Sequence, residues 1–254
     1  MKNSGKFIPS LFTILNLFCG FLSVINAVGG DMNQACLFII YAALFDAFDG
    51  VVARFTGTSS KFGVELDSLA DVVSFGFAPS FLLYHFYFIY LDGIGIALAS
   101  LPMIFSALRL ARFNSQLVGF DKNYFIGIPV PISAITLSSF FLFHFNRNFS
   151  PGLSTTVVYI LTFLLPLLMV AKFKYDITPK FSRREFKTHP VKTILVILII
   201  IMVLATRGEG LFAFCVFYLF TGIYRGVMNF LRRMLRSTRH HGDEEENLKY
   251  KTSN

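Results

Sequence analysis

The chain has no tryptophan, few charged residues and only three cysteines. Charged residues make up 15% of its 254 residues, whereas soluble domains contain about 25%. This scarcity of charge, together with a mean hydropathy of +0.61, excludes an ordinary water-soluble fold. Cys19, Cys36 and Cys215 each lie inside an apolar stretch and have no disulfide or metal-site spacing. We therefore expect them to act as small buried apolar side chains.

Long apolar segments make up most of the sequence. Eight of them have about the length needed to cross a bilayer, namely residues 9–28, 34–55, 68–91, 94–111, 128–145, 154–173, 191–206 and 210–230. The expected fold class is an all-α polytopic membrane protein with about eight transmembrane helices. We expect residues 1–236 to form one integral membrane catalytic domain, and we expect the polar tail 237–254 to be disordered.

The basic residues indicate how the chain is oriented in the membrane. If the N-terminus is cytoplasmic and the eight helices alternate, 21 of the 23 Lys and Arg residues lie on the cytoplasmic side, and only Arg147 and Arg207 lie on the other. This bias predicts a protein of the cytoplasmic membrane with both termini inside. The net charge of +8 then indicates contact with anionic lipids rather than nucleic acid. A cleaved signal peptide is the alternative for the first segment, but the segment is long and polar residues interrupt it.

Four acidic residues stand out within the second and third apolar segments. Asp46, Asp49, Asp67 and Asp71 lie between long hydrophobic runs, where each ionised carboxylate costs roughly 2.5–3.5 kcal/mol. Their spacing places each pair on one face of its helix, and a short polar loop between the helices lets the two faces meet. Carboxylates from two facing helices suit divalent cations, and such cations suit phosphate chemistry.

Two other interpretations of the acids remain open. Arg54 and Lys61 are near enough in sequence for a structural ion-pair network, although two bases leave excess negative charge among four acids. An ion-coupled transporter is the alternative from another functional class, because acids within a membrane also mark ion pathways. The clustering of the acids at one predicted membrane face argues against transport, and no inverted repeat is visible.

The string D-x-x-D-G-x-x-A-R-x8-G-x-x-x-D-x-x-x-D, from Asp46 to Asp71, resembles the signature of the CDP-alcohol phosphatidyltransferase family at every defined position. The resemblance implies two divalent cations, Mg2+ or Mn2+, bound by the four aspartates. It also implies that Asp71 is the general base, with Asp67 beside it in the catalytic centre. The nucleotide and diphosphate of a CDP-linked lipid would then be bound near Gly50, Ala53, Arg54 and Gly63.

Further stretches resemble the bacterial and archaeal phosphatidylserine synthases of that family, notably residues 67–79 and Arg109-Leu-Ala-Arg-Phe-Asn114. This resemblance implies CDP-diacylglycerol and L-serine as substrates, and the family suggests a homodimer. Arg109, Arg112 and Asn114 are the candidates for binding serine or lipid phosphate. The alternative for the two arginines is a cytoplasmic helix end, and glycerol 3-phosphate or inositol is the alternative acceptor.

Weaker candidates lie on the first and third segments. Thr13 and Asn16 either face the nucleotide or hold helices together. Ser74 and Ser80 either line the cavity below the metals or bond to the backbone, and the second interpretation is favoured. His85 lies away from the acids, and we expect it to be a packed core residue.

Overall fold

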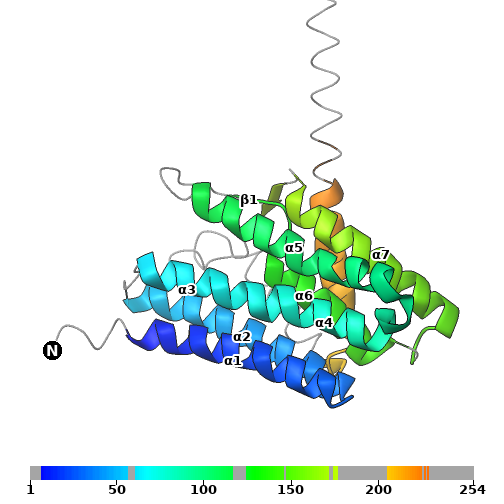
Figure 1. The fold of residues 1–254 in the computed structure, drawn as a ribbon. Coiled ribbons are helices and arrows are strands. Elements are labelled where there is room, and N and C mark those ends of the chain that lie inside the picture. The colour runs from blue at the N-terminus through cyan, green and yellow to red at the C-terminus, as the bar shows by residue number, and fades with distance from the viewer. Residues whose placement is uncertain are drawn as a thin grey trace, which may run out of the picture.

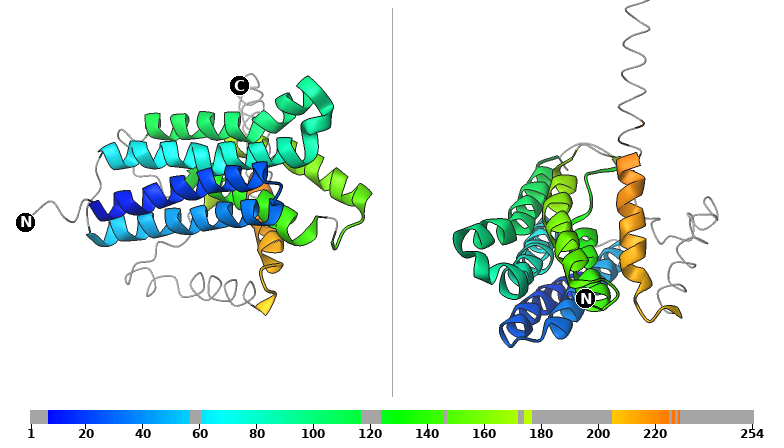
Figure 2. Two further views of the ribbon diagram at one scale, coloured as in Figure 1. Left: turned by 60° about the horizontal axis from the view of Figure 1, so that its bottom comes forward. Right: turned by 90° about the vertical axis from the view of Figure 1, so that its right-hand side faces the viewer.

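The structure, a computed structural model, describes residues 7–56, 61–116, 124–145, 147–171, 174–176, 205–224, 226 and 228. Within these residues the chain folds into a bundle of helices (Figure 1). The helices α1 (Phe7–Val28), α2 (Met32–Thr56), α3 (Lys61–Asp71) and α5 (Asp92–Gln116) run roughly alongside one another. The Gly210–Tyr224 helix runs across them (Figure 2).

The turn between α1 and α2 depends on two consecutive residues, Gly30 and Asp31. Gly30 adopts a φ of 82°, which glycine tolerates because it has no Cβ. The amide of Asp31 donates to the carbonyl of Asn26 at 3.0 Å, which satisfies the end of α1. The Asp31 carboxylate then accepts the amide of Gln34 at 2.9 Å and so caps the start of α2. The resulting hairpin places α1 directly against the acid-bearing helix.

α3 continues in one direction through several shorter helical pieces. These are η2 (Val72–Phe77, a π-helical turn), α4 (Ala78–Leu83), η3 (Tyr84–Phe88, also π-helical) and η4 (Ile89–Leu91, a 3-10 turn). The first π turn begins directly after Asp71, and such turns often occur at functional sites. The chain reverses at Asp92, whose φ is 46°, and α5 packs back along η2 and α4.

The second half of the described chain packs mainly through apolar and aromatic side chains. It contains α6 (Val130–Ser139), η5 (Phe140–His144), α7 (Pro151–Val170) and the Gly210–Tyr224 helix. The side chain of Ser150 accepts the amide of Leu153 at the start of α7, as expected for a helix cap. β1 (Tyr124–Ile126) and β2 (Lys174–Asp176) form a two-stranded antiparallel sheet. These strands are a small departure from the predicted all-α fold.

The predicted membrane class agrees with the helices. Four stretches are long and apolar enough to span a bilayer, namely Leu11–Val28, Met32–Ala53, Lys61–Ser115 and Pro151–Val170, and two shorter apolar helices are Val130–His144 and Gly210–Tyr224. The Lys61–Ser115 stretch contains the reversal at Asp92, so it holds two antiparallel helical runs. Residues 191–204 of the predicted seventh span and the tail 237–254 lie outside the described residues. The count of eight crossings therefore stays a prediction.

Candidate active site and metal centre

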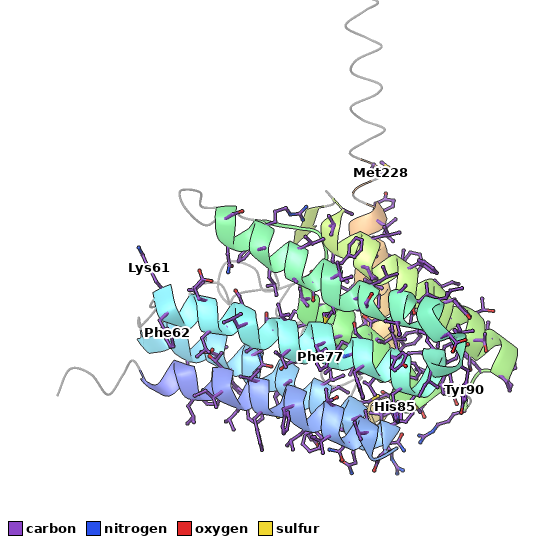
Figure 3. All side chains as sticks on the ribbon, viewed as in Figure 1. Lys61, Phe62, Phe77, His85, Tyr90 and Met228 are labelled. Carbon is purple, nitrogen blue, oxygen red and sulfur yellow. The ribbon has the colours of Figure 1, made fainter. Side chains whose placement is uncertain are left out.

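Three of the four predicted carboxylates meet between α2 and α3. Asp46, Asp67 and Asp71 each offer an oxygen that lies within 4.8 Å of the other two. Asp71 is 7% exposed, while Asp46 and Asp67 are half-buried. Figure 3 labels Lys61 at one end of this helical run, Phe77 in its middle and Tyr90 at the other end. Asp67 and Asp71 therefore lie toward the Lys61 end of the bundle.

The fourth acid, Asp49, is held by α1 rather than by this group. The hydroxyl of Thr13 donates a hydrogen bond to the Oδ2 atom of Asp49. Both side chains are buried, so α1 fixes where this carboxylate points. The described structure thus brings three predicted ligands together. The fourth, Asp49, lies one turn further along α2, where its carboxylate is held by a hydrogen bond from α1.

α1 also contacts the predicted general base. The Nδ2 atom of Asn16 donates to the Oδ1 atom of Asp71 at 3.3 Å. The hydroxyl of Ser74 in turn donates to the backbone carbonyl of Asn16 at 2.9 Å. Sequence reasoning left Thr13 and Asn16 undecided between a nucleotide contact and helix packing. Their spacing of three residues on a mainly apolar helix indicates that they share one face.

The two candidate arginines of α5 have different surroundings. Arg109 is 7% exposed and lies close enough to Asp71 to interact with it electrostatically. Arg112 donates from Nη1 to the carbonyl of Val170 at 3.1 Å, in the last turn of α7. A cation there offsets the negative end of the helix dipole. Arg109 is therefore part of the acid site, while Arg112 ties α5 to α7.

Asn114 joins α5 to α3 instead of standing free at a helix end. Its Nδ2 atom donates to the Ser68 hydroxyl at 3.0 Å, and Glu65 accepts a longer contact of 3.5 Å from the same nitrogen. Ser68 directly follows Asp67 in the chain. Asn114 therefore contacts the acid-bearing helix next to a candidate ligand, and its predicted contact with serine or phosphate stays a prediction.

The small residues of the signature lie on the helices that carry the acids. Gly50 and Ala53 are half-buried on α2, and Gly63 is half-buried in the first turns of α3. The backbone of Arg54 belongs to the last turn of α2, but its side chain lies outside the described part of the structure. Their predicted contacts with a nucleotide stay predictions.

The remaining candidates are packing residues. Ser80 accepts the backbone amide of Met103 at 2.9 Å, and Ser74 bonds to the Asn16 carbonyl, so both serines serve helix contacts as favoured. His85 stacks on Phe81 at a ring distance of 5.7 Å and lies near the Tyr90 end of the bundle (Figure 3). The three cysteines are buried and free, as expected.

A group of three carboxylates this close together is suited to binding a hard cation. Like charges repel strongly where the surrounding dielectric is low, and oxygen atoms are the ligands that Mg2+, Mn2+ and Ca2+ prefer. The donor set of Asp46, Asp67 and Asp71 therefore fits a divalent metal. Asp71 also accepts a hydrogen bond from the Asn16 amide and interacts electrostatically with the Arg109 guanidinium. The arrangement can bind a metal–phosphate group beside a base.

Comparison with known proteins agrees with this chemistry. A family model described as CDP-alcohol phosphatidyltransferase matches residues 6–171, which include all four acids. A Helicobacter pylori protein named CDP-diacylglycerol–serine O-phosphatidyltransferase is 37% identical over 86% of this chain and 90% of its own length.

Archaeal relatives show a similar percentage of identical residues. A Methanocaldococcus jannaschii protein with that name is 36% identical over 87% of this chain and 94% of its own length. An archaetidylserine synthase from Methanothermobacter thermautotrophicus is 38% identical over 66% of this chain and 69% of its own length. The likeness therefore extends well beyond the acidic signature.

Proposed function

This chain belongs to the CDP-alcohol phosphatidyltransferase family, and we propose from this premise that it transfers the phosphatidyl group of CDP-diacylglycerol to L-serine. The products are phosphatidylserine and CMP. The names of the similar bacterial and archaeal proteins support serine as the acceptor. Glycerol 3-phosphate and inositol remain the alternative acceptors, and the experiment below separates them.

The observation that carries the proposal is the meeting of Asp46, Asp67 and Asp71 between two apolar helices. We infer that these residues, with Asp49, bind two divalent cations, either Mg2+ or Mn2+. Bound there, the cations would neutralise the diphosphate of the lipid and the charge on departing CMP. Gly50, Ala53 and Arg54 belong to α2 and Gly63 belongs to α3, and these four residues are our candidates for contact with the nucleotide and diphosphate.

The reaction itself requires one proton transfer and one displacement. Asp71 takes the proton of the serine hydroxyl, and the hydroxyl oxygen forms a bond with the lipid-side phosphorus. The bond between that phosphorus and the bridging oxygen breaks, and CMP leaves with the bridging oxygen. Asn16 orients Asp71 through its hydrogen bond, and the positive charge of Arg109 offsets part of the negative charge of the site. We expect direct transfer, because the proposal already assigns the carboxylates to the metals and to the proton transfer.

We extend the proposal to the whole protein. The chain would cross the cytoplasmic membrane about eight times, with both termini and the acid site on the cytoplasmic side and its basic loops against anionic lipids. We expect residues 1–236 to be the catalytic domain and the protein to act as a homodimer. The apolar spans support membrane insertion. The orientation rests on the distribution of the basic residues, and the dimer rests on the family resemblance.

The test is release of CMP from CDP-diacylglycerol by the purified full chain in detergent with Mn2+ or Mg2+. L-Serine, glycerol 3-phosphate and inositol are supplied separately. We expect release with serine alone, and we expect Asp71→Asn to abolish it while the protein stays monodisperse.

The other outcomes discriminate between the alternatives. Release with only another alcohol would keep the enzyme class and reject serine as the acceptor. No release with any acceptor would reject the proposal and favour the transporter interpretation.

A further inference from the structure

Two buried polar atoms near Asp71 have no hydrogen-bond partner among the described residues. They are the Oδ1 atom of Asn16 and the Nε atom of Arg109; the third such atom, the hydroxyl oxygen of Ser138, lies on α6. Leaving a buried polar group unpaired costs roughly 1–3 kcal/mol, so native proteins keep few of them. Two in one site, one acceptor and one donor, need an explanation.

The orientation of the Asn16 amide is determined by its neighbour. In the proposed reaction Asp71 acts as the base, and a carboxylate that is ready to take a proton only accepts hydrogen bonds. The amide nitrogen then faces Asp71, as the 3.3 Å contact has it. The amide oxygen then points elsewhere as an acceptor. Asn16 is completely buried, and no described group donates to this oxygen. A group that binds there must therefore be a hydrogen-bond donor.

The backbone that carries Asn16 is held tightly in place. The hydroxyl of Ser74 donates to the Asn16 carbonyl at 2.9 Å. One turn further along α1, Gly20 lies so close to Ser74 that any side chain at this position would collide with it. α1 therefore packs closely against η2, the turn that directly follows Asp71. The backbone of Asn16 is therefore fixed, and the contact of its amide nitrogen with Asp71 also fixes the direction of the unpaired oxygen.

Arg109 supplies the opposite kind of group on a different helix. Its Nε–H is buried and unpaired, and its charge lies within reach of Asp71. Arg112, one turn further along α5, already donates to the carbonyl of Val170. Of the two predicted arginines, Arg109 is therefore the one with a buried donor available to a ligand.

We propose that Asn16 and Arg109 form an acceptor clamp, in which the Asn16 amide oxygen receives the ammonium group of serine and the Arg109 guanidinium receives its carboxylate. This inference rests on the proposed function and adds to it the residue that recognises the amine. The serine hydroxyl is then delivered to Asp71, which accepts the Asn16 amide and interacts electrostatically with Arg109. Glycerol 3-phosphate and inositol have no ammonium group to pair with the Asn16 oxygen.

The clamp is tested with serine fragments used as competitive inhibitors of serine-dependent CMP release. L-Alanine keeps both charged groups, propionate lacks the ammonium group, and ethylamine lacks the carboxylate. We expect L-alanine to be the strongest inhibitor of the unmodified protein. In Asn16→Leu, the advantage of L-alanine over propionate should fall roughly 10- to 100-fold, while its advantage over ethylamine should stay. Arg109→Met should show the reverse pattern.

Asn26→Leu is the matched control for Asn16. It makes the same substitution on the same helix, but the Asn26 amide bonds only to the Leu22 carbonyl of its own helix. We expect this variant to keep the inhibition pattern of the unmodified protein. Should Asn16→Leu fail to purify as a folded protein, Asn16→Ala provides the same measurement with a smaller side chain.

Three results would overturn the clamp. One is an equal loss of affinity for all three inhibitors in Asn16→Leu, which indicates a purely structural role. Another is a change confined to the metal concentration needed for half-maximal activity, which would make the Asn16 oxygen a metal ligand. The last is an unchanged pattern in both variants. Absence of serine-dependent CMP release in the unmodified protein would instead reject the proposed function, so the two failures are distinguishable.

Discussion

The acid site and the aromatic cluster differ in the side chains that occupy the space between their helices. The acid site comprises Asp46, Asp49, Asp67 and Asp71 with Thr13 and Asn16, and helices there meet through polar side chains. The aromatic cluster comprises Phe140, Phe141, Phe145, Phe149, Phe212, Tyr87, Phe88 and Tyr159, whose rings contact one another with neighbouring centroids 5.1–6.2 Å apart.

This difference indicates that the acid site serves the reaction, while the aromatic cluster stabilises the fold. Packed rings leave little space and no charge to neutralise, so they contribute to the free energy of unfolding. Clustered carboxylates are a cost to the folded state until a cation binds. We therefore expect substitutions in the two regions to affect different measurements.

The largest expected effect is the loss of a carboxylate at the acid site. Asp67→Asn removes a charge from the group that can bind a metal and should lower the rate of CMP release at least about 100-fold. The Tm of the purified protein should stay the same or rise, because the substitution relieves repulsion among the carboxylates. Asp92→Asn is the control, since Asn tolerates the positive φ of this turn. An equal loss of CMP release in the two variants would contradict a specific role of the acid site in the reaction.

The next largest effect is expected in the aromatic cluster. Phe140 is completely buried and its ring lies 5.3 Å from that of Phe212. Phe140→Ala should lower the free energy of unfolding by about 2–3 kcal/mol. This is below the value for aqueous cores, because lipid also solvates an exposed ring. Unfolding by SDS titration measures the change, with Phe217→Ala, 67% exposed, as the control. The KM for serine should be unchanged in the folded fraction. A change in this KM would contradict the view that the aromatic cluster affects stability alone.

The smallest expected effect concerns the support that α1 gives to the acid site. Thr13→Val keeps the shape of the side chain but removes the hydroxyl that donates to Asp49. Residues that orient metal ligands typically affect affinity 10- to 100-fold, and we expect about a 10-fold rise in the Mn2+ concentration for half-maximal activity. Thr162→Val is the matched control, because its hydroxyl bonds to the Val158 carbonyl of its own helix. A similar rise in both variants would contradict a specific role for Thr13.

Much of the site was predictable from local sequence pattern. The spacing of Asp46, Asp67 and Asp71 along two apolar helices places them on facing sides of a hairpin, because helical period and loop length are local properties. The same pattern failed to predict the π turn after Asp71 and the two short strands. These depend on how neighbouring helices press on the chain rather than on residue propensity.

The sequence by itself determined the membrane class, the helical runs described and the facing positions of Asp46, Asp67 and Asp71, because hydrophobic length and periodicity decide these within one or two adjacent segments. The tertiary structure alone decided which atoms meet across distant segments. It pairs Asp49 with Thr13 and Arg112 with the end of α7. It leaves Asn16 and Arg109 each with a buried atom that has no partner among the described residues. Such contacts join residues far apart in the chain, and only the packing of the whole bundle brings them together.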